Sequence, residues 1–471
     1  MRGAGVVKQA MRRRDFLVGL AAAASAAACG SAAPTGSAAR ASLGSQTGSA
    51  AVGASFPHGR LVDWRITRWR ADPWALGSYS YLAPGASSST RRTLARPVGD
   101  RLFFAGEATD GDHPATVHGA LASGRRAAAE VVANAPAGPV VVVGAGVAGL
   151  GAARDLMAAG RTVVVVEARD RIGGRVWSVD VGDAVVDLGG SWLHGLRDNP
   201  ITGIAESLGI ELVRTDYDDA LLFDADGSPL SWSALDDQYE AVDELLGSSV
   251  STSSMAAAAA ELRGRFTGAG LRYLEYVLAS EVEHWYAASV DDMSFATTRD
   301  GGPSRGGDAI PRTSYRPIVD WLAKGLDVRL GEPVSAIRAT DAEVTVVTDA
   351  GPHDGAAAVV TLPLGVLKAG VVEFDPVLPS SKRAAIEGLG MGVMDKVVLR
   401  FDEAFWPTNT DLFSYASEPP GQYVEWYNAV PWTDRPILVG FNAGRPADEI
   451  ESWSDDETLD LALGTVGMIR W

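Results

Sequence analysis

The feature that most constrains how this chain folds is a run of valines at 140–143, which leads directly into Gly144-Ala145-Gly146-Val147-Ala148-Gly149. Four consecutive valines are typical of a parallel strand that is buried on both faces. The alanine-rich stretch that follows predicts a helix. In such a strand–turn–helix unit Gly144 permits the tight turn, Gly146 lets a pyrophosphate approach the backbone, and Gly149 lets the helix pack on the strand. The pattern predicts a dinucleotide-binding unit in an α/β fold.

A second strand, predicted over 162–166, ends at Glu167. An acid at this place accepts hydrogen bonds from adenosine ribose hydroxyls, and it argues against a 2′-phosphate. Arg169, Gly174 and Arg175 follow within one loop. A nicotinamide dinucleotide does not need this loop, whereas the longer FAD runs along it. The sequence therefore predicts FAD, with Arg169 and Arg175 either holding its pyrophosphate or ordering the loop.

The first residues indicate an export signal. Arg12-Arg13-Arg14 precedes a short apolar stretch at 16–28, which is the layout of a signal peptide, and the paired arginines resemble a twin-arginine signal. The small residues before Cys29 resemble a lipoprotein cleavage site. We therefore expect export to the cell surface, with or without a lipid anchor at Cys29. An apolar N-terminal helix is the alternative interpretation.

Composition excludes several classes of site. The formal net charge of −18 argues against nucleic-acid binding and favours a cationic substrate or partner. Cys29 is the single cysteine, so neither an intrachain disulfide nor a cysteine-based zinc site is possible, and we expect no metal site. No apolar run reaches the roughly 18 residues that a membrane span needs.

Further stretches resemble a known family. They are Asp187-Leu188-Gly189-Gly190-Ser191-Trp192-Leu193-His194-Gly195, Leu330-Gly331-Glu332-Pro333-Val334, Thr361-Leu362-Pro363-Leu364-Gly365-Val366-Leu367 and Asp395-Lys396-Val397-Val398-Leu399-Arg400-Phe401. In these motifs the sequence resembles the flavin-containing amine oxidases, which include monoamine oxidases, polyamine oxidases and lysine-specific histone demethylases. The resemblance implies a Rossmann-like FAD-binding domain of the glutathione-reductase type with an inserted α+β substrate domain.

The order of the motifs departs from the family. Three stretches that resemble the family's C-terminal pieces, at 69–81, 101–109 and 113–124, stand here before the glycine-rich turn. The resemblance therefore implies a circular permutation, and a rearranged or misassembled gene is the alternative. New termini are best tolerated at a surface loop.

These inferences divide the chain into segments. We expect a twin-arginine or lipoprotein-like signal (1–29), a flexible linker (30–57), the permuted C-terminal segment (58–138), the FAD-binding βαβ unit (139–205), a helical substrate domain (206–304), the rest of the FAD-binding domain (305–365) and the rest of the substrate domain (366–471).

The resemblance also implies roles for individual residues. Lys396 is expected to hold a water near the flavin N5, and Tyr79 to form an aromatic wall beside the substrate amine. His194 matches a pocket histidine, with a structural role as its alternative. Ser78 stands where monoamine oxidases carry a flavin-linking cysteine, so noncovalent FAD is expected. The cofactor-binding candidates are Gly106, Glu107, Thr116, Val117, Gly144, Gly146, Ala148, Gly149, Glu167, Arg169, Gly174, Arg175, Gly190, Ser191, Trp192 and Val334.

The implied activity is FAD-dependent oxidation of an amine to an imine and then an aldehyde, with dioxygen reduced to hydrogen peroxide. Thr116 replaces the second aromatic wall of the monoamine oxidases, which favours a longer, polyamine-like substrate. The expected partners are a small cationic amine and dioxygen, and no nucleic acid. Two alternatives remain open: a desaturase or porphyrinogen oxidase of the same fold, and an inactive surface lipoprotein that retains the fold.

Overall fold

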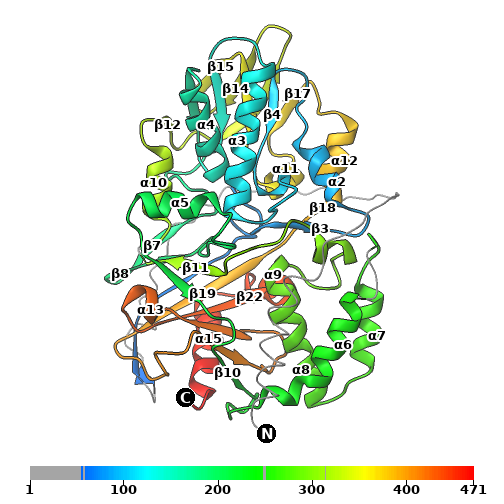
Figure 1. Cartoon of the computed structure of the whole chain (residues 1–471), viewed down its shortest axis with the longest axis vertical. Helices are drawn as coiled ribbons and strands as arrows, with labels where there is room; N and C mark the ends of the chain where they lie inside the picture. The colour runs from blue at the N-terminus through cyan, green and yellow to red at the C-terminus, as the bar shows by residue number, and fades with distance from the viewer. Residues whose placement is uncertain (1–54, 57–58, 248–250, 313) are drawn as a thin grey trace.

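The computed structural model describes residues 55–56, 59–247, 251–312 and 314–471. The expected signal segment with Cys29, and nearly all of the expected linker, lie outside these residues. The described chain is elongated, with one half built around a parallel sheet and the other around a larger, mainly antiparallel sheet (Figure 1). In the part of the chain that the structure describes, no helix is both long enough and apolar enough to cross a membrane.

A five-stranded parallel sheet forms the centre of the first half. Its strands, in spatial order, are β12 (Asp327–Arg329), β6 (Val163–Val166), β5 (Val140–Val143), β16 (Ala357–Val360) and β4 (Leu102–Phe104). All four valines of β5 are buried, as predicted for a central parallel strand. Gly144, with a φ of +103°, turns the chain into α4 (Val147–Ala158). The predicted strand–turn–helix unit is therefore present.

One face of this sheet carries α4 together with α3 (Val117–Asn134). The two helices approach closely at Gly124, where a Cβ would lie 2.1 Å from the carbonyl oxygen of Ala148. The N-terminal segment, which supplies α3, also supplies β4 at the edge of the sheet. This segment and the glycine-rich unit therefore build one layer together.

The other face of the parallel sheet is covered by a four-stranded sheet and by short helices. The strands, in spatial order, are β15 (Gly351–Gly355), β14 (Val344–Thr348), β13 (Val334–Ala339) and β17 (Glu373–Asp375). The helices are α2 (Ser88–Ala95), α11 (Leu364–Ala369) and α12 (Ser380–Gly388).

This arrangement corrects one expected domain boundary. Val372, Leu378, Ile386 and Met391 share an apolar core with strands β5 and β16. The boundary expected at 365 is therefore wrong, because the chain leaves the first half only after about residue 391.

A seven-stranded sheet forms the second half. Its strands, in spatial order, are β1 (Ser55–Phe56), β2 (Gly59–Ile66), β19 (Met394–Phe401), β22 (Ile437–Ala443), β21 (Glu425–Asn428), β20 (Leu412–Tyr415) and β10 (Ala220–Phe223). Beside it pack α6 (Asp236–Gly247), α7 (Ala256–Gly264) and α8 (Ala269–Leu278). The region expected to be helical, 206–304, begins with two strands, β9 (Leu212–Thr215) and β10, before its helices start.

Shorter elements complete the described chain. They are β3 (Ser80–Leu82), β7 (Ser178–Val181), β8 (Ala184–Asp187), α5 (Pro200–Ser207), α9 (His284–Tyr286), β11 (Asp308–Pro311), α10 (Arg316–Ala323), β18 (Leu389–Met391), α13 (Val430–Thr433), α14 (Gly444–Ile450) and α15 (Asp455–Met468).

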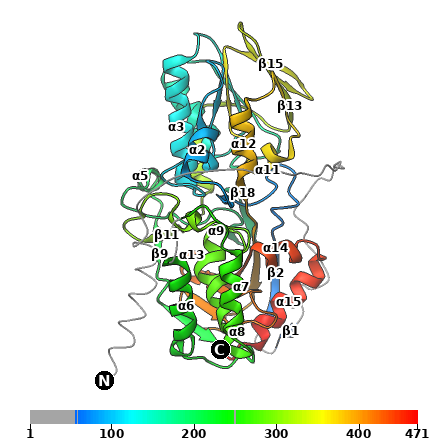
Figure 2. The ribbon, with the colours of Figure 1, turned by 90° about the vertical axis from the view of Figure 1, so that its right-hand side faces the viewer.

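The last helix lies beside the first long strand of the described chain. Leu459 and Leu463 of α15 share an apolar core with Leu61 and Trp64 of β2. Figure 2 shows α15, β1 and β2 together at one side of the second half. The two ends of the described chain are therefore neighbours in space.

Candidate active site

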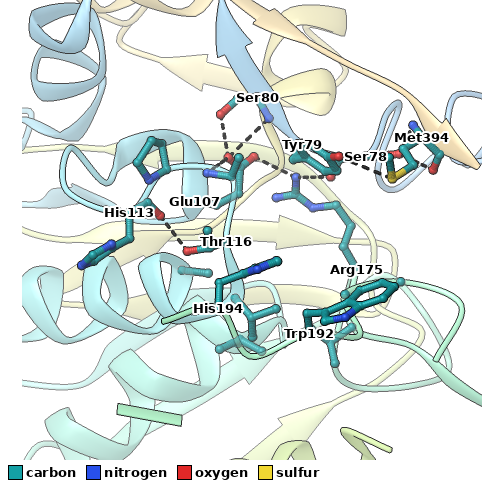
Figure 3. Close-up of a pocket in the computed structure, with 18 of the residues that line it drawn as sticks. Ser78, Tyr79, Ser80, Glu107, His113, Thr116, Arg175, Trp192, His194 and Met394 are labelled. Carbon is teal, nitrogen blue, oxygen red and sulfur yellow. Dashed lines mark hydrogen bonds and ion pairs between the residues drawn. The ribbon is translucent and has the colours of Figure 1, made fainter. Parts of the chain in front are cut away.

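A cavity of about 910 Å³ is lined by residues from both halves. This volume is at the upper end of the range for small-molecule and cofactor sites. All but one of the residues predicted to bind the cofactor or to act in catalysis line this cavity, and several of them are drawn in Figure 3. The exception is Gly149, where a Cβ would lie 1.9 Å from the carbonyl oxygen of Gly144. Gly149 therefore lies under the turn, in the packing role that the sequence predicted.

Two glycine-containing loops form one end of the cavity. They are joined by a backbone hydrogen bond of 2.8 Å from the Gly173 N–H to the carbonyl oxygen of Ala145. A Cβ on Gly146 would meet nothing nearer than the Cα of Gly174, at 4.0 Å. A side chain at Gly146 would therefore fill open room beside the bare backbone, which is the room that a pyrophosphate needs.

Glu167 lies buried beside these loops. Its carboxylate accepts the backbone N–H groups of Ala145, at 2.7 Å, and of Arg169, at 2.9 Å, which leaves lone pairs for ribose hydroxyls. The N-terminus of α4 opens at the same place, and no side chain caps it. Bare glycine backbone, a fixed carboxylate and uncapped helix N–H groups together fit the adenosine and pyrophosphate parts of FAD.

The start of α3 forms another part of the lining. Thr116 caps this helix, because its Oγ1 accepts from the Gly119 N–H at 3.0 Å. The same Oγ1 donates to the His113 carbonyl oxygen at 2.8 Å (Figure 3). A Cβ on Gly190 would lie 2.8 Å from Val117 Cγ2, so the loop at 187–191 lies against the same helix end. The start of α3, at Thr116 and Val117, thus lines the cavity, and the N-terminus of a helix favours negative charge on a bound group.

Arg169 forms an ion pair with Asp72 of the N-terminal segment. The guanidinium donates two parallel hydrogen bonds to the carboxylate, at 2.8 and 2.9 Å, and both side chains are 11% exposed. Of the two alternatives for Arg169, the structure favours ordering of the loop over direct contact with a pyrophosphate.

Glu107 is the centre of a second buried network. It accepts hydrogen bonds from Arg175 at 2.9 Å, from Ser80 Oγ at 2.6 Å and from the Ala115 N–H at 3.1 Å (Figure 3). Burial acts to raise the pKa of Glu107, but the charges of Arg175 and Arg91 hold it below its ordinary value. Glu107 therefore stays charged and anchors the N-terminal segment, a role that the sequence did not reveal.

Lys396 extends from β19 to the loop at 187–191. Its Nζ donates to the carbonyl oxygens of Asp187, at 3.0 Å, and Gly189, at 2.7 Å, and to Ser191 Oγ at 2.6 Å. Burial lowers the pKa of Lys396 to about 8, against the opposing charge of Asp187. All three ammonium protons of Lys396 are thus used to hold this loop in place. The water that was expected on Lys396 can bind only if it replaces one of these three hydrogen bonds, or if Lys396 is a neutral amine with a free lone pair.

One face of the seven-stranded sheet also lines the cavity. Lys396 lies opposite Phe441 on β22, and Phe441 lies opposite Glu425 on β21. Directly opposite residues point to the same face, so the three side chains form a row, and all three line the cavity. Two strand spacings separate Lys396 from Glu425, which is roughly 10 Å. The sequence predicted Lys396 alone, because this row depends on strand register.

Tyr79 and His194 lie on other parts of the lining, and both are fixed by hydrogen bonds. The Tyr79 hydroxyl donates to the carbonyl oxygen of His284 at 2.6 Å, and burial, followed by the charge of Glu107, raises its pKa above the ordinary value. His194 Nδ1 lies 2.8 Å from the carboxylate of Asp308, a residue the sequence analysis missed. With its Nδ1 proton donated to Asp308, His194 keeps Nε2 as a hydrogen-bond acceptor.

The fold and this cavity define an FAD-binding oxidoreductase of mixed α/β architecture. The chain belongs to the flavin-containing amine oxidoreductase family, which it matches over residues 58–132 and 147–468. It is 33% identical over 348 residues to Polyamine oxidase 4 of Oryza sativa subsp. japonica, a match covering 69% of this chain and 71% of that protein. Polyamine oxidase 2 of Arabidopsis thaliana gives the same identity, length and coverages. Lysine-specific histone demethylase 1 homolog 1 of O. sativa subsp. japonica is 34% identical over 366 residues, which are 71% of this chain and 43% of the demethylase.

A solved structure of putrescine oxidase bound to putrescine shares the fold. It matches with a TM-score of 0.55 and 21% sequence identity, over 70% of this chain and 81% of that chain. The predicted family and the mixed α/β fold are thus confirmed. The chain is an FAD-dependent oxidoreductase that acts on CH–NH or CH–NH₂ donors, and its FAD is bound noncovalently. Family membership favours this activity over the desaturase or porphyrinogen oxidase and over the inactive scaffold.

Proposed function

We propose that this chain oxidises a polyamine or a similar primary or secondary amine, with dioxygen as the electron acceptor. The distribution of charge in the cavity carries the proposal. At the cofactor end, the arginines each pair with an acid: Arg91 with Asp300, Arg169 with Asp72 and Arg175 with Glu107. Elsewhere the lining holds six further carboxylates against three cations, Arg214, Arg299 and Lys396; the carboxylates are Asp112, Asp216, Asp218, Glu281, Asp308 and Glu425. A surplus of carboxylates attracts a cationic amine.

The chemistry that FAD supplies when bound is acceptance of a hydride from the amine α-carbon, followed by return of the electrons to dioxygen as hydrogen peroxide. The chain's own residues bind and orient the amine. Tyr79, Trp192 and Phe441 present aromatic rings to the cavity, which suit an alkylammonium. Lys396 keeps the loop at 187–191 in place through its three hydrogen bonds. The imine product then hydrolyses to an aldehyde.

An oxygen-electrode assay with peroxide detection tests this proposal. Spermine, spermidine, putrescine and tyramine are supplied separately to the FAD-loaded protein. We expect the polyamines to give oxygen uptake with equimolar peroxide, and tyramine to give less. Uptake with tyramine alone, or with none of the four, would exclude a polyamine substrate.

We also propose that the chain is a circular permutation of the family fold. Its family match falls in two blocks, 58–132 and 147–468, and the first block supplies strands to both large sheets. The ends of the described chain lie side by side, so a short link could join them. A rearranged variant that runs from residue 139 to 471 and then from 59 to 134 should fold and bind FAD. Failure of this rearranged variant to bind FAD would contradict the permutation.

We further propose export through the twin-arginine route to the cell surface, with Cys29 as a lipid-anchor site. The paired arginines and the small residues before Cys29 support this proposal. Substitution of both Arg12 and Arg13 by lysine should retain the protein inside the cell, and Cys29→Ala should release exported protein from the membrane fraction. Unchanged fractionation of either variant would refute the corresponding step.

A further inference from the structure

The cavity contains a buried histidine–glutamate pair that the proposed reaction does not use. His284 Nδ1 lies 2.7 Å from a carboxylate oxygen of Glu425, and both side chains are less than a tenth exposed. Both residues line the cavity. The other ring nitrogen, Nε2, is buried and has no hydrogen-bond partner among the described residues. A buried polar atom without a partner is costly, so its retention calls for an explanation.

The backbone around His284 is also unusual. Between α8 and α9 the chain forms a π-helical turn, Ala279–Glu283, and His284 follows it directly. Such turns are rare and occur frequently at functional sites. Ser280, four residues before His284, lines the cavity too, and its Oγ is buried with no partner in the described ranges. One turn of helix thus contributes two polar side chains to the cavity lining, each with an unsatisfied atom.

The pair has the chemistry of an ammonium acceptor. When His284 donates its Nδ1 proton to Glu425, Nε2 is left as an acceptor and the pair carries one negative charge. A further acid, Glu281, lies on the same turn and also lines the cavity. Nε2 is shielded in this structure, so a ligand reaches it by displacing neighbouring side chains.

We propose that Ser280 and His284, backed by Glu425, bind a second, protonated nitrogen of the substrate, which is not the nitrogen that is oxidised. This subsite rests on the proposed amine oxidase function. Glu425 lies two strand spacings from Lys396, roughly 10 Å away, so the pair suits a nitrogen several carbons from the reacting carbon. The Tyr79 hydroxyl, bonded to the His284 carbonyl oxygen, joins the subsite to the aromatic lining.

Paired amines of equal chain length test this subsite. The kcat/KM of the FAD-loaded protein is measured for 1,4-diaminobutane and n-butylamine, and for the corresponding six-carbon pair. The wild-type protein should prefer the diamines. His284→Phe should lower kcat/KM for the diamines by about 10- to 100-fold, the factor for a hydrogen bond to a charged group, and by less than about threefold for the monoamines.

Two further variants separate binding from structure. Glu425→Gln can still accept the Nδ1 hydrogen bond but removes the negative charge, so it should lower the diamine preference in the same direction. His353→Gln is the matched control, because His353 forms a similar pair with Glu332 at 2.6 Å and neither residue lines the cavity. FAD content and the thermal midpoint report whether each variant folds.

Equal losses for diamines and monoamines in both cavity variants would overturn the subsite, as would an unchanged diamine preference. A wild-type protein that oxidises monoamines and diamines equally well would also overturn it, while leaving the amine oxidase function in place. A wild-type protein that oxidises no amine would refute the proposed function itself, and the subsite with it.

Discussion

The Arg169–Asp72 pair gives the sharpest test of how the cavity is held together. In the structure the guanidinium orders two loops instead of standing free for a phosphate. Arg169→Ala therefore leaves the Asp72 carboxylate buried without its partner. The damage should appear in the protein with and without FAD, because the lost interaction lies within the chain.

The burial of this ion pair sets how much Arg169→Ala lowers the free energy of unfolding. Breaking a buried ion pair by removing one partner costs about 3–5 kcal/mol. Both side chains retain 11% exposure, so some water reaches the orphaned carboxylate and we expect the lower end, about 3 kcal/mol. The double variant Arg169→Ala/Asp72→Ala should lose less than the single variant, because it removes the orphaned charge as well.

Urea unfolding of FAD-free and FAD-loaded protein, followed by tryptophan fluorescence, measures this loss. The matched control is Arg329→Ala, which breaks a pair with Asp327 of the same two-bond geometry, at 2.7 and 2.9 Å, on an exposed strand. The control should shift the midpoint little. The reasoning is refuted if Arg169→Ala leaves the FAD-free midpoint unchanged and weakens FAD binding alone, since Arg169 would then be a phosphate ligand.

Three other perturbations follow from the same structure. Gly149→Ala should abolish FAD loading, because its Cβ would lie 1.9 Å from the Gly144 carbonyl oxygen. The control Gly203→Ala in α5, where no atom lies within 4 Å of a Cβ, should raise the free energy of unfolding by about 0.5–1 kcal/mol; normal FAD content in Gly149→Ala would contradict the packing argument. Thr116→Val removes the N-cap of α3 and should cost about 1 kcal/mol in urea unfolding, and an unchanged midpoint would show that the cap is dispensable. Lys396→Met tests the lowered pKa: between pH 8 and about 10.4 the unfolded chain keeps a proton on Lys396 that the folded protein releases. Wild-type stability relative to Lys396→Met should therefore rise by about 1.4 kcal/mol per pH unit across that window and stay level below pH 8; a difference that falls with pH would contradict it.

The parts of the fold that follow from local sequence were predictable. The valines at 140–143 and the turn at Gly144 depend on neighbouring residues, and both are present as predicted. The residues that the family motifs predicted for the site also line one cavity, apart from Gly149. The boundary at 365 failed for a different reason: the stretch that follows packs back on to the parallel sheet, and no local pattern records that contact.

Side-chain partners were the part that the sequence could not supply. Arg169 and Asp72 stand 97 positions apart, and Glu107 and Arg175 stand 68 apart, so their pairing depends on the folded chain. The row formed by Lys396, Phe441 and Glu425 depends on strand register in the same way. The sequence predicted Glu107, Arg169 and Arg175 as cofactor-binding residues but not Asp72, and it revealed neither ion pair.

We expect the two family-matching blocks of this chain to build one amine-oxidising FAD site. An anaerobic absorption spectrum tests it most directly: the purified protein is mixed with spermine, spermidine or putrescine and the visible flavin bands are followed. We predict that at least one of these amines bleaches the bands and that air restores them with release of peroxide. Bound flavin that no amine bleaches would contradict amine oxidation, and a purified protein that binds no flavin would contradict the assembly of the site itself.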